Sequence, residues 1–227
     1  MYKDKTFLAI IPARGGSKRL PRKNILDLDG EPLIAYSIES AQKSKYIDKV
    51  IVSSDDNEIL KISQTYGIDI LKRPAELASD TSTSFDAIKH AIKHSNKYDY
   101  IILLQPTSPL RNFKHIEEAI ELLEEKNADA IISVCEMDHS PLWSNTLNES
   151  FSMKGFLRDE VLNKRSQDLE TYYRLNGAIY ICKTNKLLEE ESFFLKENIF
   201  AYIMDRKSSI DIDEEIDFKI AETLLNA

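Results

Sequence analysis

Short apolar runs that alternate with amphipathic helical patterns constrain the fold of this chain more than any other feature. The apolar residues of each run fill consecutive positions, which is typical of strands covered on both faces of a sheet. This alternation predicts an α/β sandwich with a mainly parallel sheet. The runs lie at 7–13, 49–55, 68–73, 100–105 and 130–136, and the helical patterns lie at about 32–44, 56–66, 83–95 and 113–126.

The alternation stops after about residue 137. Residues 138–175 are polar and mixed in composition, and strand patterns return only at 176–183 and 200–204. Residues 213–226 have the pattern of a final amphipathic helix. The chain shows no internal repeat or flexible linker. We therefore expect a single domain over 1–227, with an excursion at about 138–200 that covers a site or contacts another subunit.

The composition limits the classes of function. Apolar residues make up 42% of the chain and charged residues 30%, as in an ordinary soluble protein. A net charge of −8 argues against a general nucleic-acid binder or a protein of the membrane surface. No apolar run approaches the ~20 residues of a membrane span, and the N-terminus lacks a signal peptide's long apolar segment. Cys135 and Cys182 lie inside apolar runs, so we expect buried thiols and a cytoplasmic protein.

One short stretch of this acidic chain is strongly basic. Residues 10–24, "IIPARGGSKRLPRKN", hold five basic side chains and two glycines directly after the first expected strand. Ligands of open α/β sheets bind where strands end, and glycines let backbone N–H groups approach an anion. We expect Lys18, Arg22 and Lys23 to hold a triphosphate and to stabilise a leaving pyrophosphate. The spacing fits neither a Walker A loop nor a dinucleotide fingerprint, and the alternative is a solvated basic turn.

Two further segments have the residue types of a site. Asp211 and Asp213 are two apart in an extended stretch, so both carboxylates point to one face and suit Mg²⁺. The alternative is that Asp213 caps the last helix. Gln105 ends an apolar strand before a Pro-Thr-Ser-Pro turn, where its amide can bind a substrate or complete the turn's own hydrogen bonds.

Five sequence blocks keep one order along the chain: "PARGGSK…PRKN", "RPAELASDTSTS" (73–84), "LLQPTSPLR" (103–111), "NGAIYI" (176–181) and "SIDIDEEID" (209–217). In these blocks the chain resembles the CMP-acylneuraminate synthetases, including those of the CMP-legionaminate type. The resemblance implies a Rossmann-like nucleotidyltransferase sandwich with a small dimerisation excursion. It also implies a Mg²⁺-dependent homodimeric cytidylyltransferase that activates a nine-carbon α-keto acid sugar, such as N-acetylneuraminate or legionaminate, with CTP.

The same resemblance implies roles for individual residues. Lys18, Lys23 and Asp211 are expected to be catalytic, and Asp211 and Asp213 to hold Mg²⁺. The residues expected to bind the nucleotide are Arg14, Gly15, Gly16, Ser17, Lys18, Lys23, Asn24, Arg73 and Ser84. Those expected to bind the sugar acid are Gln105, Arg165, Arg174, Asn176, Tyr180, Phe193 and Phe194, with the two phenylalanines reaching the neighbouring subunit's pocket.

Some alternatives stay open at this point. Tyr180, Phe193 and Phe194 equally suit the core, and Arg111 suits a surface charge or a structural ion pair. "RSQDLE" and "MDHSPLW", on the sugar side, depart from the family pattern, which leaves the identity of the acid open. The rival functions are a cytidylyltransferase for the eight-carbon acid Kdo and a non-catalytic nucleotide-binding protein on the same fold.

Overall fold

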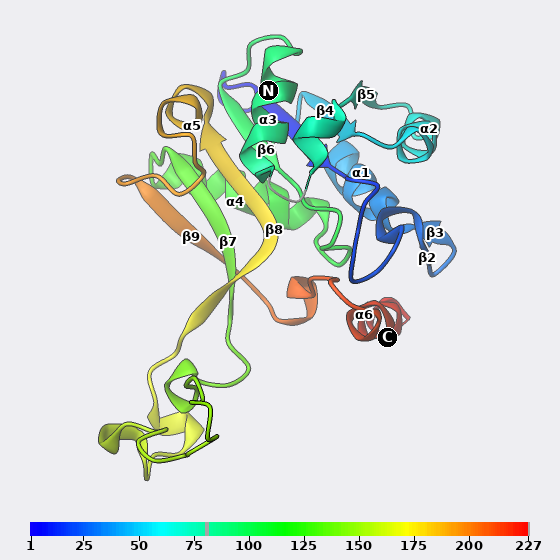
Figure 1. The fold of residues 1–227 in the computed structure, drawn as a ribbon. Coiled ribbons are helices and arrows are strands. Elements are labelled where there is room, and N and C mark those ends of the chain that lie inside the picture. Colours follow the sequence, from blue (N-terminus) through cyan, green and yellow to red (C-terminus); the bar gives the residue numbers. More distant parts are fainter. Residues whose placement is uncertain (80–81, 227) are drawn as a thin grey trace.

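A seven-stranded sheet in the order β5-β4-β1-β6-β8-β7-β9 forms the centre of the computed structural model, which describes residues 1–79 and 82–226 (Figure 1). Strands β5, β4, β1 and β6 run parallel, β7 pairs in parallel with β9, and β8 is antiparallel to both β6 and β7. The strands are β1 (Phe7–Pro12), β4 (Lys49–Ser54), β5 (Asp69–Lys72), β6 (Tyr100–Leu103), β7 (Ala130–Glu136), β8 (Tyr173–Lys183) and β9 (Ile199–Met204).

Helices cover both faces of this sheet. Phe7, Ala9 and Ile11 of β1 pack with α1 (Leu33–Lys43), α2 (Asn57–Thr65) and α4 (Phe113–Glu125). Leu8 and Ile10 pack on the other face with α3 (Ser84–Lys93) and α5 (Thr184–Glu190). The predicted α/β sandwich with a mainly parallel sheet is therefore confirmed. Within the described ranges, no helix is both long enough and apolar enough to cross a membrane.

A smaller cluster packs the C-terminal helix against the hairpin that follows the basic stretch. The hairpin consists of β2 (Asp27–Leu28) and β3 (Glu31–Pro32), and the helix is α6 (Glu215–Leu225). Leu28, Leu33, Ile212 and Ala221 are all 0% exposed in this cluster. The segment around residues 209–213 is thereby held beside the first loop of the chain. Short 3₁₀ turns lie at Lys23–Ile25, Ala75–Ala78, Pro141–Trp143, Asp159–Val161, Ser166–Asp168 and Lys207–Ser209.

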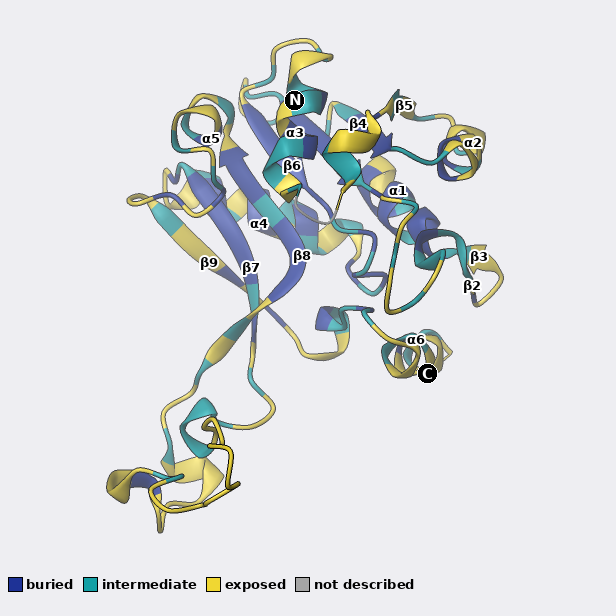
Figure 2. Cartoon of the chain, in the orientation of Figure 1, coloured by how far each residue is buried: buried dark blue, intermediate teal, exposed yellow. Residues whose placement is uncertain are grey.

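Residues 137–172 leave the body of the protein. They follow β7, contain irregular chain and three of the 3₁₀ turns, and return at β8 (Figure 1). Most of their side chains are exposed, whereas the strands of the sheet are buried (Figure 2). From residue 176 onward, β8 lies in the sheet, and α5 packs on the body as well. We call residues 137–172 the excursion below, a narrower segment than the expected 138–200.

A kink in β8 marks where the excursion departs. Gly177 has a φ of +73°, and the register between β7 and β8 shifts between Ile132 and Val134. Asn176 is 1% exposed, and its amide nitrogen donates to Ser209 Oγ at 2.9 Å. Its Oδ1 accepts from Ser133 Oγ at 2.6 Å and from the Ala178 N–H at 3.2 Å. The amide of Asn176 thus makes its hydrogen bonds at the kink, and the role expected for it in sugar binding stays a prediction.

The central position of β1 generates a stability prediction. Ile10 is 0% exposed and lies between Ile51 of β4 and Leu103 of β6. Truncating it leaves a cavity, so Ile10→Ala is expected to cost about 3 kcal/mol in the free energy of unfolding, measured by urea titration. Ile70→Ala, on edge strand β5 where Ile70 is 36% exposed, is the control and is expected to cost clearly less. Equal losses would contradict this placement of the core.

Candidate functional site

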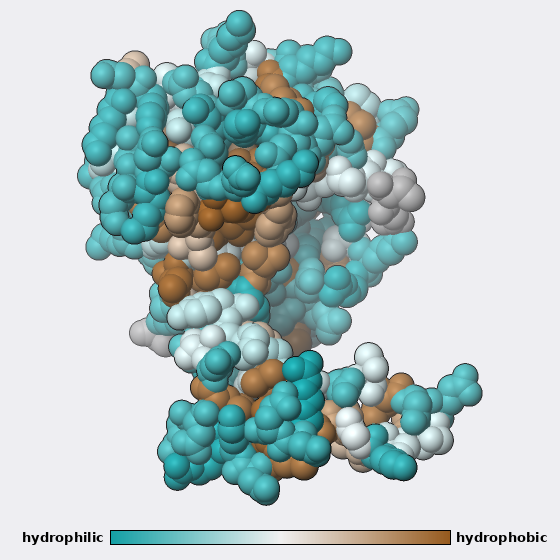
Figure 3. All heavy atoms as spheres, turned by 90° about the vertical axis from the view of Figure 1, so that its left-hand side faces the viewer, coloured by the Kyte–Doolittle hydropathy of each residue, from teal (hydrophilic) through white to brown (hydrophobic). Residues whose placement is uncertain are grey.

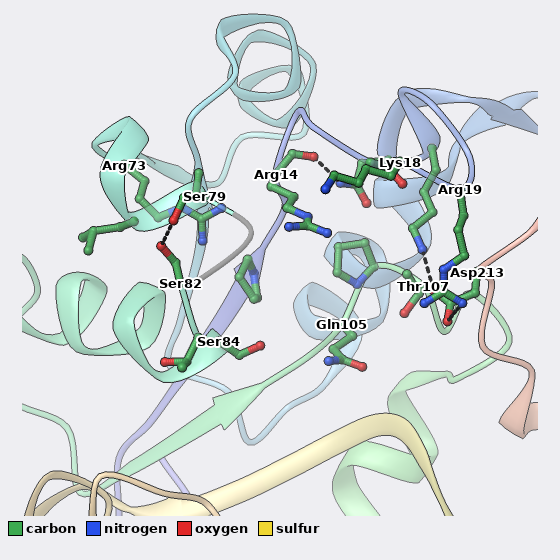
Figure 4. A pocket seen from close by; sticks show the side chains of 18 residues that line it. Arg14, Lys18, Arg19, Arg73, Ser79, Ser82, Ser84, Gln105, Thr107 and Asp213 are labelled. Atoms are coloured by element: carbon green, nitrogen blue, oxygen red, sulfur yellow. Dashed lines mark hydrogen bonds and ion pairs between the residues drawn. The ribbon is translucent and has the colours of Figure 1, made fainter.

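The loops that follow three of the parallel strands, β1, β5 and β6, line one pocket together with Asp213. Strands β5, β4, β1 and β6 end at the same edge of the sheet, and the pocket there has a volume of about 610 Å³. Arg73, Ser79, Ser82 and Ser84 lie on one side of it, and Lys18, Arg19, Thr107 and Asp213 on the other (Figure 4). The residues expected from the sequence that line the pocket are Arg14, Ser17, Lys18, Lys23, Asn24, Arg73, Ser84, Gln105 and Asp213.

Acidic residues after β4 fix the N-terminal part of the basic loop, residues 13–26. The Gly15 N–H donates to Asp55 Oδ1 at 3.1 Å. A Cβ on Gly15 would lie 2.7 Å from Asp56 Oδ2, so this glycine is required by the close approach of the two segments. The Gly15 amide is thus turned to a protein carboxylate, and its expected role in nucleotide binding stays a prediction. Neither Gly15 nor Gly16 is among the lining residues.

Arg22 is also turned away from the pocket. It has a φ of 60°, and its guanidinium lies 2.5 Å from both Asp56 Oδ2 and Glu58 Oε2 of the α2 N-terminus. Two carboxylates therefore neutralise Arg22 in this structure, and the expectation that it holds a triphosphate stays a prediction. Asn24 is only 5% exposed, and its Nδ2 donates to the Arg14 carbonyl at 2.9 Å. This hydrogen bond joins the two ends of the basic loop.

The other end of the basic loop is joined to the segment before α6. Lys23 Nζ donates to the Ile212 carbonyl at 2.6 Å and lies 3.1 Å from Asp213 Oδ1. Arg19 Nη1 lies 3.1 Å from Asp213 Oδ2. Arg19 was missed by sequence reasoning, although its place beside Lys18 in a basic run was an available signal. Glu214, with Asp217 in a capping box, caps α6. The alternative that Asp213 is the cap is therefore wrong, and its carboxylate faces the cations.

The residues around Asp211 fit a divalent cation. Asp211 Oδ1 is a buried atom with no hydrogen-bond partner among the described residues. Burial raises the pKa of Asp211, against a hydrogen bond from Thr107 that lowers it. An unpartnered buried carboxylate oxygen, with Asp213 two residues on, suits Mg²⁺, which prefers oxygen ligands. In the described part of the chain no cluster of three or more His, Cys, Asp or Glu side chains could hold a metal alone, so phosphate and water oxygens would complete the shell.

The opposite end of the pocket is built from the loop after β5. Arg73 is 4% exposed, lies 3.9 Å from Asp55 Oδ1, and has a pKa lowered by burial. Ser79 Oγ and Ser82 Oγ lie 2.7 Å apart, and Ser82 Oγ donates to the Glu76 carbonyl at 2.6 Å. Thr83 caps α3 in a capping box with Asp86, as expected for a structural residue. Asp80 and Thr81 of the same block lie outside the described residues.

Of the residues expected to bind the sugar, only Gln105 lines the pocket. A Cβ on Gly177 would lie 2.6 Å from Gln105 Oε1, so the amide rests against the kink of β8. Arg174 donates weakly to the Leu175 and Ser209 carbonyls at 3.4 Å. Arg165 stands on the excursion, where its guanidinium lies 2.9 Å from Asp168 Oδ2.

The aromatic residues form a separate group. Tyr180 is half-buried, its pKa is raised by burial, and its ring centroid lies 5.9 Å from that of Phe193 and 6.2 Å from that of Phe194. Phe193 is 6% exposed and packs in the core with Leu8 and Leu187, whereas Phe194 is 53% exposed. The ring of Phe193 is thus enclosed in its own subunit, and the role expected for it in a neighbouring pocket stays a prediction.

Comparison with known proteins assigns this arrangement to a family. The sequence profile described as Cytidylyltransferase matches residues 8–224. The chain belongs to the cytidylyltransferase family. An N-acylneuraminate cytidylyltransferase of Escherichia coli is 40% identical over 96% of this chain, which covers 51% of that protein, so the chain spans about half the length of this relative.

Other cytidylyltransferases match along their whole length. A pseudaminic acid cytidylyltransferase of Campylobacter jejuni is 37% identical over 96% of this chain and 95% of its own. A CMP-N,N'-diacetyllegionaminic acid synthase of Legionella pneumophila is 34% identical over 96% and 95%. The solved structure of a CMP:2-keto-3-deoxy-manno-octonic acid synthetase complexed with CTP superposes with a TM-score of 0.74 at 19% identity, covering 97% of this chain and 98% of that one, which shows a shared fold.

The attachment of the basic loop generates a pH prediction. Burial opposes ionisation of Asp56, but Arg22 and the N–H groups of Ile59 and Glu58 hold its pKa below the usual value. A lowered folded pKa stabilises the folded state above the unfolded pKa, and this stability is lost as pH falls through the folded pKa. Asp56→Asn keeps the helix cap but loses the charge, so its melting temperature is expected to lie below wild type at pH 7.

The gap between Asp56→Asn and wild type is expected to close as pH falls below about 4, measured by thermal melts in a series of buffers. Arg22→Gln is the matched control, because it removes the other residue of the ion pair. The losses in melting temperature caused by Arg22→Gln and Asp56→Asn are expected to be less than additive in the double variant. A gap that stays constant from pH 7 to pH 3 would contradict a charge-based attachment of the loop.

Proposed function

We propose that the chain is a Mg²⁺-dependent cytidylyltransferase that joins CMP from CTP to a nine-carbon α-keto acid sugar and releases pyrophosphate. The observation that carries this proposal is the pocket itself, where a basic loop faces Asp213 beside the unpartnered Asp211 Oδ1. Relatives named for N-acylneuraminate, pseudaminic acid and legionaminic acid support the substrate class. The anomeric hydroxyl of the sugar attacks the α-phosphorus, the bond from this phosphorus to the pyrophosphate oxygen breaks, and the hydroxyl proton is released.

The charges of the pocket suggest how CTP lies in it. Its triphosphate belongs at the end with Arg14, Lys18 and Lys23, which offset the charge that grows on the leaving pyrophosphate. Its cytidine belongs at the other end, beside Arg73 and Ser84. The volume of about 610 Å³ is that of an ordinary small-ligand pocket, large enough for a nucleotide.

Asp211 and Asp213 are the residues that would hold Mg²⁺. Mg²⁺, when bound, neutralises phosphate charge and makes the α-phosphorus more electrophilic. Lys23, which contacts Asp213 in the protein alone, can exchange this carboxylate for a phosphate oxygen once CTP is present. Gln105 lines the pocket next to β8, and we call this part of the pocket its floor. The amide of Gln105 is placed there to hydrogen-bond the sugar acid.

A second copy of the chain supports the sugar side in this proposal. Edge strand β9 forms one side of the body and exposes Ile203 at 57% on one face of the sheet and Phe200 at 40% on the other, and the ring of Phe194 is 53% exposed. Apolar side chains gather on this face of the body and on the excursion (Figure 3). An exposed apolar patch on an edge strand is a liability that a partner subunit removes. Arg165 on the excursion then belongs to the neighbouring pocket, where its fork suits the sugar carboxylate.

The proposed compartment is the cytoplasm. Cys135 and Cys182 are free and buried, and burial raises the pKa of Cys182 to about 12. Unoxidised cysteines of this kind fit a reducing compartment.

Pyrophosphate release tests the activity directly. The protein, CTP and Mg²⁺ are incubated with N-acetylneuraminate, legionaminate, pseudaminate or Kdo, with UTP as the nucleotide control. We expect turnover on at least one nine-carbon acid with CTP and none with UTP. Turnover on Kdo alone would contradict the substrate class, and CTP binding without any turnover would favour the non-catalytic alternative.

Asp211→Asn separates catalysis from stability. The burial that raises the pKa of Asp211 makes its charge costly in the folded protein, so removing the charge is expected to raise the melting temperature of the protein alone at pH 7.5. Turnover is expected to fall by at least about 100-fold, with CTP binding by calorimetry in the absence of Mg²⁺ largely retained. Unchanged turnover would contradict the metal assignment, and a lower melting temperature would contradict the buried charge.

The dimer is tested by light scattering. We expect wild type to have twice the mass of the chain, and Ile203→Glu on β9 to have the monomer mass because a charge enters the apolar interface. Ile216→Glu, on α6 where Ile216 is 59% exposed, is the control and is expected to remain dimeric. A monomeric wild type at working concentration would contradict the second copy.

A further inference from the structure

A guanidinium lies buried beneath the pocket floor and has no part in the mechanism above. Arg111 is 0% exposed and is among the largest fully buried side chains of the described protein. It is neither of the alternatives considered from the sequence. It is not at the surface, and the only influence on its pKa is burial, with no carboxylate contributing.

Arg111 joins three elements that meet at the floor. Its Nε donates to the Ala178 carbonyl of β8 at 3.3 Å. Its Nη2 donates to Ser37 Oγ of α1 at 2.6 Å and to the Gln105 carbonyl at 3.4 Å. Ser37 Oγ in turn donates to the same Gln105 carbonyl at 3.2 Å. One guanidinium thus holds the backbone of Gln105 and the backbone next to Gly177.

The turn that Arg111 holds also fixes the segment of Asp211. The Ile212 N–H donates to the Thr107 carbonyl at 2.8 Å, and the Thr107 side chain hydrogen-bonds Asp211. From a Cβ placed on Gly177, Gln105 Oε1 would be 2.6 Å away and Asp211 Oδ2 3.6 Å away. The side chains of Gln105 and Asp211 therefore meet at the kink of β8, above the backbone that Arg111 binds.

Stability alone does not account for this charge. A buried cation without a carboxylate carries a desolvation cost, and burial lowers the pKa of Arg111 to about 9, so the group is still protonated at neutral pH. Its Nη1 has no hydrogen-bond partner among the described residues, which adds to the cost. Apolar side chains of similar volume often replace buried charges without loss of stability.

We propose that Arg111 is a positioning residue of the transferase reaction, which holds Gln105 against β8 and, through the Thr107 turn, sets Asp211 in place. The chemical roles of Gln105 and Asp211 in this proposal rest on the proposed function. The ordering of these two residues by Arg111 rests only on the contacts above. An experiment can therefore contradict one of these statements and leave the other standing.

The first test needs no substrate. Hydrogen–deuterium exchange is measured on the protein alone, in peptides that cover 104–110, 175–179 and 209–213. Arg111→Lys keeps the charge but cannot make the three donations, so exchange in these peptides is expected to accelerate by about tenfold or more, with α2 unchanged. Unchanged exchange in all three would overturn the proposal, whether or not any sugar acid is turned over.

Two serines provide a matched pair if Arg111→Lys does not fold. Ser37→Ala removes one acceptor of Arg111, and Ser63→Ala removes a serine that is equally 0% exposed but donates only to the Ile59 carbonyl within α2. We expect faster exchange at 104–110 in Ser37→Ala and no change there in Ser63→Ala. The same exchange in both variants would overturn the proposal.

Kinetics then distinguish positioning from general support. Arg111→Lys is expected to lower kcat by about tenfold or more, while KM for CTP stays within about twofold, because the nucleotide contacts come from loops 13–26 and 73–84. Parallel changes in kcat and KM that follow the fraction unfolded would overturn the positioning role. If wild type turns over none of the four acids, the proposed function fails, and the exchange result still decides the role of Arg111.

Discussion

The contact of Lys23 with Asp213 and the Ile212 carbonyl joins the first loop of the chain to the last segment before α6. The two residues of the ion pair are 190 positions apart, so this contact depends on the fold that brings the two ends of the chain together. The pocket exists because parallel strands end at one edge and this contact closes it on one side. The ion pair is partly buried, with the Lys23 side chain 12% and the Asp213 side chain 45% exposed, and it holds a cation and a carboxylate where, in the proposed function, a nucleotide phosphate and a metal would each replace a partner.

Carboxylates from other elements surround the basic loop and neutralise part of its positive charge. Asp55 and Asp56 fix Gly15 and Arg22 at one end, and Asp213 faces Arg19 and Lys23 at the other. The loop itself has no acid, so its positive charge is offset only by residues from other elements. The loop is consequently ordered before any ligand arrives, which lowers the entropy cost of binding.

The sequence predicts the elements of the body well because each carries its own pattern. Residues 7–13 and 113–126 were expected as a strand and a helix, and the structure places β1 at Phe7–Pro12 and α4 at Phe113–Glu125. The partners of single polar residues were not predictable in this way. Asn176 serves a β-bulge, Gly15 meets Asp56, and Arg111 lies in the core, and each depends on a contact distant in sequence. A sequence motif gives only residue types and their order. The roles of these three residues depend instead on contacts with segments that are distant in sequence.

Arg111 and Asp211 both contact the turn formed by residues 105–108, and each keeps a charged group in surroundings that disfavour the charge. Arg111 and Asp211 carry opposite charges, each has a buried atom without a hydrogen-bond partner among the described residues, and burial is the leading influence on the pKa of both. Direct pairing would relieve part of this cost. The turn instead keeps them apart, so that Arg111 binds backbone carbonyls and Asp211 retains an open oxygen. A stable core alone would favour the pair, whereas the cation site that we propose would need Asp211 unpaired and held in place.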